Sequence, residues 1–115
     1  MRKVTVILIL LLAITLQYCA TTQPAAVKPT VSKITYVSSI QPLLAKHCSP
    51  CHFPPEGNKE PLNTYATAKN GIDDILDRIQ RNPGEKGFMP AKHARLPDSI
   101  IRVFVRWEIE GAVER

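Results

Sequence analysis

Cysteine and histidine are scarce in this chain of 115 residues, which contains three of each. A structural zinc site needs four ligands, usually from two pairs at comparable spacing. Besides the cluster Cys48, Cys51 and His52, only His47 and His93 remain, since Cys19 lies far away beside an apolar segment. The shortage of ligands therefore disfavours a zinc-binding domain.

Strand patterns and basic runs with interleaved aromatics are also lacking. A thioredoxin-like Cys-x-x-Cys requires strands that alternate with helices, and the sequence contains no such alternation. Nucleic-acid binding usually shows a concentrated basic stripe, whereas the lysines and arginines here are dispersed, with a formal net charge of +5. We therefore expect neither dithiol chemistry nor a nucleic-acid partner.

The chain also lacks an apolar run long enough for an ordinary membrane span. Arg2 and Lys3 precede the apolar run Val4–Leu16, which is shorter than the roughly 20 residues that a spanning helix needs. A basic start followed by a short apolar run is typical of an export signal. Residues 1–20 are therefore predicted to be a signal peptide or lipoprotein signal, with an uncleaved anchor as the alternative.

Cys19 is the odd cysteine and is a candidate for lipidation. Leu16 stands three residues before it, as in bacterial lipoprotein signals, but Tyr18 occupies the position where a small residue is usual. Lipidation, cleavage elsewhere and an unmodified cysteine in an anchor stay open. Residues 21–33, rich in Thr, Pro and Ala, are predicted to be a flexible tether, and residues 34–115 the folded domain.

The strongest motif is Cys48-Ser49-Pro50-Cys51-His52, which has the Cys-x-x-Cys-His pattern of c-type haem attachment. Each thiol can add across one vinyl group of the porphyrin. His52 can then provide an axial imidazole nitrogen to the iron. Because haem is attached outside the bacterial cytoplasmic membrane, the export signal and the motif support each other. We expect one covalent haem c and a location in the periplasm or cell envelope, tethered to the membrane.

Apolar periodicity predicts an all-α domain of short helices. The predicted helices cover residues 37–48, 65–70, 72–81 and 97–110. The first is expected to be capped by Ser38 or Ser39 and the second by Asn63 or Thr64, with Gly111 ending the last. The third helix has one apolar face, made of Ile72, Ile75, Leu76 and Ile79. The last has a broad apolar stripe, made of Ile100, Val103, Phe104 and Trp107 and widened by Ile101, Val105 and Ile109. A domain this small has a marginal protein core, so a bound macrocycle would complete it.

Met89 is the candidate for the second axial ligand. It lies on a loop rich in Gly and Pro, and it is the only methionine besides the initiator. A His/Met pair fills both axial positions and raises the reduction potential. His93 is the alternative, giving bis-histidine ligation, whereas His47 is expected on the surface or partly in the core.

These features resemble the small monohaem cytochromes of the cytochrome c superfamily, in the class I arrangement. The resemblance covers about residues 34–112 and is carried by Leu43-Leu44, His47 to His52, Met89-Pro90, Leu96-Pro97-Asp98, Trp107 and Gly111-Ala112. It implies a cytochrome c-like fold of three to four helices wrapped around one haem, with the first and last helices crossing so that Leu44 and Trp107 lie close together. It also implies Arg78 as a propionate contact, with a solvated arginine as the alternative, and Tyr65 as a propionate donor or a core residue.

The function expected from these features is single-electron transfer rather than enzyme catalysis. The expected partners are redox proteins that donate and accept electrons, with the domain acting as a monomer or as a subunit of a complex. The alternatives are a haem-bearing subunit of a redox enzyme, a small haem peroxidase, or a sensor in which a ligand displaces Met89.

Overall fold

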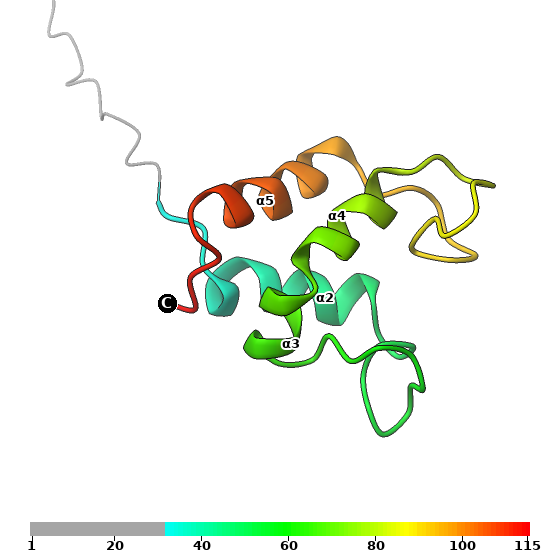
Figure 1. The fold of residues 1–115 in the computed structure, drawn as a ribbon, viewed down its shortest axis with the longest axis horizontal. Coiled ribbons are helices and arrows are strands. Elements are labelled where there is room, and N and C mark those ends of the chain that lie inside the picture. Colours follow the sequence, from blue (N-terminus) through cyan, green and yellow to red (C-terminus); the bar gives the residue numbers. More distant parts are fainter. Residues whose placement is uncertain (1–31) are drawn as a thin grey trace, which may run out of the picture. The chain divides into compact units, whose positions relative to one another are not determined.

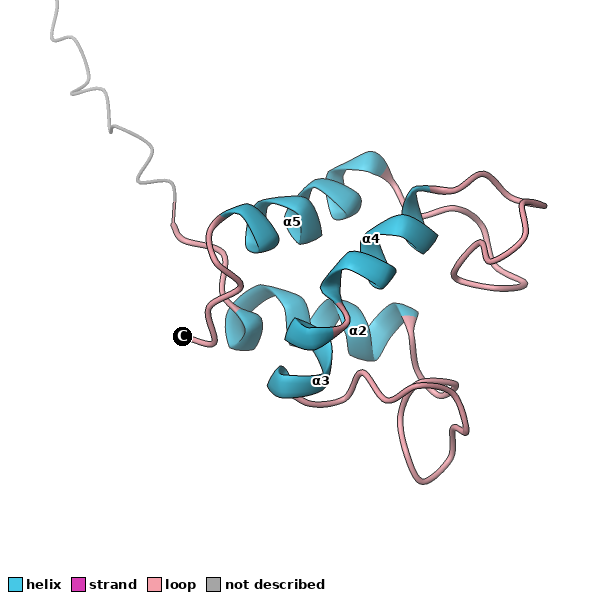
Figure 2. Cartoon of the chain, in the orientation of Figure 1, coloured by secondary structure: helices cyan, strands magenta, loops and turns pink. Residues whose placement is uncertain are grey.

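The computed structural model describes residues 32–115, so the predicted signal segment and all but the last two residues of the predicted tether lie outside the described residues. Within residues 32–115 the chain forms helices and loops and no strand (Figures 1 and 2). The all-α prediction is confirmed for this part of the chain. None of the helices in this part combines the length and the apolar character needed to cross a bilayer.

The first helical segment starts with a π-helical turn, η2 (Tyr36–Ile40), which continues directly into α2 (Gln41–His47). Its cap is Thr35, whose side-chain oxygen accepts a hydrogen bond from the Ser38 N–H at 3.2 Å. The predicted cap at Ser38 or Ser39 is therefore wrong. The reason is a long-range pairing: the Tyr36 N–H donates to the Val113 carbonyl at 2.9 Å, which satisfies a donor of the first turn from the other end of the chain.

Helices α3 (Tyr65–Asn70) and α4 (Ile72–Gln80) follow one another with only Gly71 between them. A reciprocal capping box between Thr64 and Thr67 starts α3, which agrees with one of the two predicted caps. Helix α4 ends one residue earlier than predicted, because Arg81 has extended backbone angles. Its predicted apolar face is confirmed as buried.

The last helix, α5 (Asp98–Ile109), lies where the apolar stripe predicts it and packs against both η2 and α4. Its buried side chains are Ile101, Phe104 and Trp107. Ile109, which was expected to widen the stripe, is instead 76% exposed. It is the last residue of the helix, where no other element covers it.

The core is built around two large side chains of α5 and two aliphatic side chains of the first helix. Trp107 and Phe104 are almost completely buried, as are Ile40 and Leu44. Leu44 and Trp107 belong to one hydrophobic core, and the Tyr36 and Trp107 rings lie 6.3 Å apart. The first and last helical segments are thus packed together.

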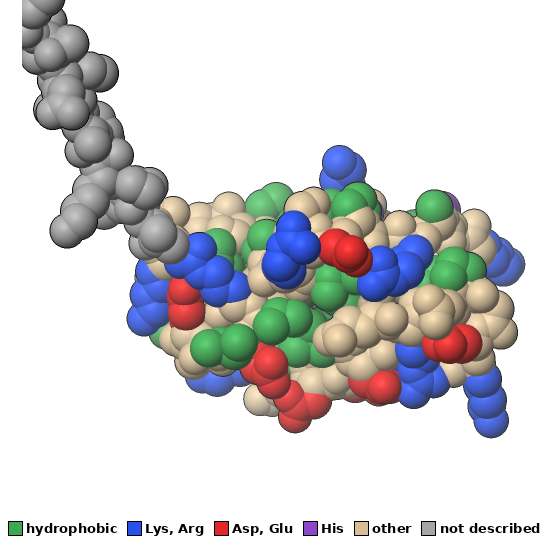
Figure 3. Space-filling model, turned by 90° about the horizontal axis from the view of Figure 1, so that it is seen from above, with side chains coloured by type: hydrophobic (Ala, Val, Ile, Leu, Met, Phe, Trp, Pro, Cys, Tyr) green, Lys and Arg blue, Asp and Glu red, His purple; other side chains and the backbone are tan. Residues whose placement is uncertain are grey.

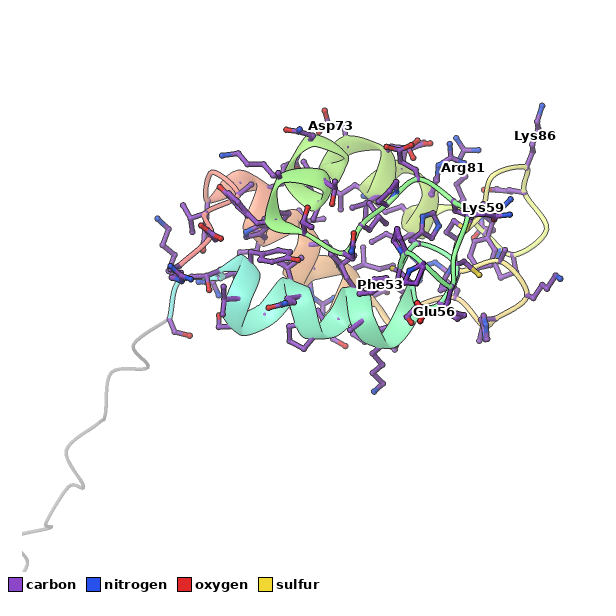
Figure 4. The ribbon with its side chains drawn as sticks, turned by 90° about the horizontal axis from the view of Figure 1, so that it is seen from below. Phe53, Glu56, Lys59, Asp73, Arg81 and Lys86 are labelled. Atoms are coloured by element: carbon purple, nitrogen blue, oxygen red, sulfur yellow. The ribbon has the colours of Figure 1, made fainter. Side chains whose placement is uncertain are left out.

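Two loops lie at one side of the domain, and the first and last described residues lie together at the other side. The loop between α2 and α3 and the loop between α4 and α5 extend to the same side in Figures 1 and 4. At the other side, the backbone N–H groups of Tyr36 and Val37 donate to the carbonyls of Val113 and Glu114. The loop end contains the residues that the sequence singled out.

Candidate functional site

The Cys-x-x-Cys-His motif lies where α2 ends. Cys48 is the C-cap of this helix and donates its N–H to the Leu44 carbonyl at 2.8 Å. The chain then turns, and the His52 N–H donates to the Cys48 carbonyl at 3.0 Å. Helix α2 is held in the core by Leu44, so the motif is attached to a rigid element.

The loop after the motif folds back onto it. The N–H groups of Lys59 and Leu62 donate to the carbonyls of Cys51 and His52, at 3.1 and 2.9 Å. Gly57 makes this return possible, because a Cβ atom at this position would lie 2.2 Å from the Cys51 carbonyl oxygen. A side chain of any kind would push the loop away from the motif.

The same loop orients the imidazole of His52. Nδ1 of this ring lies 2.7 Å from the backbone oxygen of Glu60. A carbonyl only accepts, so Nδ1 carries the proton in the neutral ring and Nε2 keeps its lone pair. A backbone carbonyl in this position is the usual partner of a histidine that binds a metal through its other nitrogen.

A cavity of about 500 Å³ brings the predicted site residues together. All five that were predicted from the sequence line it: Cys48, Cys51, His52, Arg78 and Met89. They come from three segments that are distant in the chain, namely the motif, α4 and the loop before α5. The alternative ligands His47 and His93 line it as well.

The loop that contains Met89 is attached to the end of α4. The Met89 N–H donates to the Arg78 carbonyl at 3.2 Å, and the Arg81 guanidinium donates to the Lys86 carbonyl. In Figure 4, Arg81 and Lys86 lie at the same end of the domain as Phe53, Glu56 and Lys59 of the other loop. These contacts keep the thioether beside the cavity that the motif also lines.

Arg78 combines a cavity-lining position with an ion pair. Its guanidinium donates to the Asp74 carboxylate at 2.6 Å, and this hydrogen bond lowers the pKa of Asp74. The Arg78 side chain is 39% exposed, so the pair itself adds little stability. The guanidinium can therefore interact with a negative group at the mouth of the cavity. Charged side chains of both signs are interspersed on the face shown in Figure 3.

The residues present fit a covalently attached haem. The cavity volume falls in the range of about 300–1,000 Å³ that is typical of cofactor pockets. Apolar side chains from three parts of the domain, namely the loop before α3, helix α4 and the loop before α5, contribute to the lining: Leu62, Ile75, Ile79 and Leu96. The donor set consists of two thiols, one oriented imidazole and one thioether, which is the set that c-type haem uses. Within residues 32–115, no group of three or more His, Cys, Asp or Glu side chains is placed to hold a metal ion by itself.

The state of Cys48 bears on the dithiol alternative. Burial raises the pKa of its thiol to about 11, so the group is a neutral thiol at pH 7. Cysteines that exchange disulfides have a lowered pKa and sit beside positive charge or a helix N-terminus. Cys48 stands at a helix C-terminus instead.

Three further predicted residues have definite positions. His47 is half-buried, as expected, and its Nε2 is inaccessible to solvent with no hydrogen-bond partner. His93 is exposed and close enough to line the cavity. Tyr65 is not among the described residues that line the cavity, and its hydroxyl donates to the Ala112 carbonyl at 3.0 Å. The structure uses Tyr65 to attach the C-terminal segment, and its ring packs against the core, which agrees with the core alternative.

Sequence reasoning missed two contributors to the site. Gly57 stands in a loop already rich in Pro, and only its approach to the motif shows why the position needs glycine. The Glu60 carbonyl is a backbone group, for which a sequence contains no signal. Comparison of the chain with protein-family models, curated proteins and solved structures finds no match.

Proposed function

We propose that residues 34–115 form a class I-like c-type cytochrome domain that carries single electrons. The observation that supports this most strongly is the cavity of about 500 Å³, which the attachment cysteines, an oriented histidine and a methionine line from separate parts of the chain. A cytochrome c-like arrangement of helices around one covalent haem would explain why so small a domain leaves a large space beside its core. The haem would supply a one-electron ferric–ferrous couple when bound.

The cysteines would hold the haem permanently. When the haem is bound, each thiol would join it through a thioether, with the S–H adding across a vinyl double bond and its hydrogen going to the other vinyl carbon. The turn that ends α2 would present Cys48 and Cys51 for this attachment. Two thioethers would tie the cofactor to the helix whose other end lies in the core.

His52 and Met89 would be the axial ligands. Nε2 of His52 is left free by the hydrogen bond from Nδ1 to the Glu60 carbonyl. The backbone hydrogen bond from the Met89 N–H to the Arg78 carbonyl limits the movement of the loop that contains the Met89 thioether. Filled axial positions on a rigid frame favour electron transfer over oxygen or peroxide chemistry. Arg78 would face a haem propionate.

We further propose that the domain works outside the bacterial cytoplasmic membrane, with residues 1–20 as an export or lipoprotein signal and Cys19 as the candidate for lipidation. Its partners would be redox proteins that donate and accept electrons. Mass spectrometry of the protein isolated from membranes tests the tether. An N-terminal Cys19 with added acyl mass is expected for the lipoprotein form, and an unmodified Cys19 excludes it.

The haem assignment is tested by expressing the full chain with its export signal in a bacterium that matures c-type cytochromes. A pyridine haemochrome spectrum of the purified protein is expected to show haem with both vinyl groups saturated. Cys48→Ala and Cys51→Ala variants are each expected to show one unsaturated vinyl group. An exported, folded and colourless protein would refute the proposal.

The axial ligands are tested by a pair of matched variants. The oxidised protein is expected to show the weak absorption band near the red edge that arises from methionine–iron charge transfer. Met89→Ala should abolish this band, and His93→Ala should preserve it. Loss of the band in His93→Ala alone, or its absence from the unmodified protein, would exclude Met89 as the ligand.

A further inference from the structure

The loop that contains Met89 is held to the domain by hydrogen bonds rather than by packing. Every residue from Asn82 to Lys86 is exposed, and residues 87–89 are half-buried. No residue of the segment 82–89 belongs to the hydrophobic core of the described chain. A segment with few buried apolar contacts opens easily unless specific bonds retain it. The position of Met89 therefore depends on the groups that bind the backbone of this loop.

Short-range hydrogen bonds make the loop one compact unit. The Asn82 N–H donates to the Glu85 carboxylate at 2.8 Å, and the Glu85 N–H donates to the Asn82 carbonyl at 3.1 Å. The Phe88 N–H then donates to the Glu85 carbonyl at 3.0 Å. These bonds connect each part of the segment to the next. A change in how the loop is attached at one residue therefore also affects Met89.

Arg81 attaches this unit to helix α4 through its side chain. Its Nη2 donates to the Asp77 carboxylate at 2.5 Å, which fixes the guanidinium on the last turn of α4. Its Nη1 donates to the Lys86 carbonyl of the loop. A guanidinium has a planar fork of donors for two such acceptors, whereas an ammonium is a single point charge. The Arg81 side chain thus connects the helix with the loop.

Gly87 shows how closely the loop lies against the guanidinium groups. A Cβ atom at this position would lie 2.7 Å from Nη1 of Arg81 and 3.2 Å from Nη1 of Arg78. The φ angle of Gly87 is +85°, in the left-handed region that favours glycine. Two residues later, the Met89 N–H donates to the Arg78 carbonyl at 3.2 Å. The loop is therefore attached to α4 on both sides of Gly87.

We propose that Arg81 is the positioning residue for Met89, because it holds the loop on α4 and so keeps the thioether at the cavity. The proposal deepens the electron-carrier function and rests on it, since a fixed thioether matters when it is an axial ligand. Arg81 is not among the described residues that line the large cavity, so it acts through the loop. Its ion pair with Asp77 is partly exposed and adds little stability by itself. The pair orients the guanidinium toward the Lys86 carbonyl.

The test compares the purified full chain with its Arg81→Gln variant, and Arg95→Gln is the matched control. Both arginine side chains are 35% exposed, and each forms an ion pair with an aspartate. The acceptors of Arg95 are the Leu96 carbonyl and the Asp98 carboxylate, which lie outside the segment 82–89. Both variants lose one positive charge, so a difference between them reports the contact with the loop.

Two measurements are made on each protein. In amide hydrogen exchange followed by NMR, the Met89 N–H should exchange about two- to tenfold faster in Arg81→Gln, as for one lost hydrogen bond, with the Ile79 N–H of α4 unchanged. The methionine–iron band of the oxidised protein should lose intensity in Arg81→Gln and keep it in Arg95→Gln. Arg81→Lys should resemble Arg81→Gln, because lysine lacks the planar fork.

The haem content of the unmodified sample is measured separately. A colourless protein would refute the electron-carrier proposal, and the exchange of the Met89 N–H would still decide whether Arg81 holds the loop. Unchanged exchange in Arg81→Gln would overturn the role of Arg81 at any haem content. Equal acceleration at Ile79 would also overturn it, since α4 would then fray as a whole. An intact methionine–iron band alongside faster exchange, or full recovery in Arg81→Lys, would likewise exclude positioning by the guanidinium.

Discussion

Replacing Gly57 by alanine tests the way the loop after the motif is held. The added Cβ would lie 2.2 Å from the carbonyl oxygens of Pro50 and Cys51, whereas ordinary contacts begin near 3.4 Å. The loop must therefore move by about 1 Å, and the obstructing atoms are backbone atoms that cannot rotate away. Overpacking of this kind costs about 1–3 kcal/mol. In a domain of 60–100 residues, each kcal/mol lowers Tm by about 4–8 °C.

The expected result is a decrease in Tm of about 4–24 °C for Gly57→Ala, measured by thermal unfolding followed with far-ultraviolet circular dichroism. Gly71→Ala is the matched control, since its Cβ would lie 3.2 Å from the Thr67 carbonyl oxygen, a much milder contact. The loss of chain entropy in the unfolded state offsets that contact, so the control should stay near the Tm of the unmodified protein.

A second readout distinguishes displacement of the loop from general destabilisation. Moving the loop away from the motif would lengthen the hydrogen bond from His52 Nδ1 to the Glu60 carbonyl. Faster solvent exchange of the Nδ1 proton in Gly57→Ala is therefore expected by NMR, with no such change in Gly71→Ala. If Gly57→Ala melted within about 2 °C of the unmodified protein with this proton still protected, the contact argument would be wrong.

Three further perturbations test other parts of the structure. Tyr65→Phe removes the hydrogen bond to the Ala112 carbonyl and should lower the free energy of unfolding by about 0.5–1.5 kcal/mol in thermal unfolding. The visible spectrum should stay unchanged, and a changed spectrum would contradict this structural role of Tyr65. Glu110→Gln should lower Tm at pH 7, because the hydrogen bond from the Ile34 N–H lowers the pKa of Glu110 in the folded state. The difference in Tm between the variant and the unmodified protein should disappear as the pH falls through the folded-state pKa of Glu110. A difference that persists in acid would contradict this linkage. Arg78→Gln should lower the reduction potential by tens of millivolts, on the order expected for the loss of one positive charge at the cavity. A potential measured by voltammetry that is unchanged or raised would exclude Arg78 as a charge that acts on the haem.

The helices could be predicted because each is marked by local signals. Thr64 and Gly71 bound α3, and the apolar face of α4 repeats at helical spacing, so both helices lie within a residue of the prediction. The attachment motif and Met89 could also be selected from the sequence, because their residue types have few other uses in such a pattern. The cavity then showed that these residues lie together.

The failures came from long-range contacts. Which hydroxyl caps the first helix depends on the pairing of Tyr36 with Val113, and nothing near residue 36 indicates that pairing. Likewise, the hydrogen bond from the Tyr65 hydroxyl to the Ala112 carbonyl joins residues that are distant in sequence, so no local signal indicates it. Ile109 is exposed because α5 ends there, where no neighbouring element covers it. The periodicity of apolar residues along one helix does not indicate where its neighbours end.

The hydrogen bonds between residues 36–37 and residues 113–114 have a consequence for how such a unit can be used. Both ends of the described chain leave the domain at the same side, away from the two loops that line the cavity (Figure 1). Adjacent termini of this kind allow a domain to be inserted into, or appended to, another polypeptide with little strain. The unit is therefore suited to modular fusion, in which a host protein could carry it at either end while the cavity stays open to a third molecule.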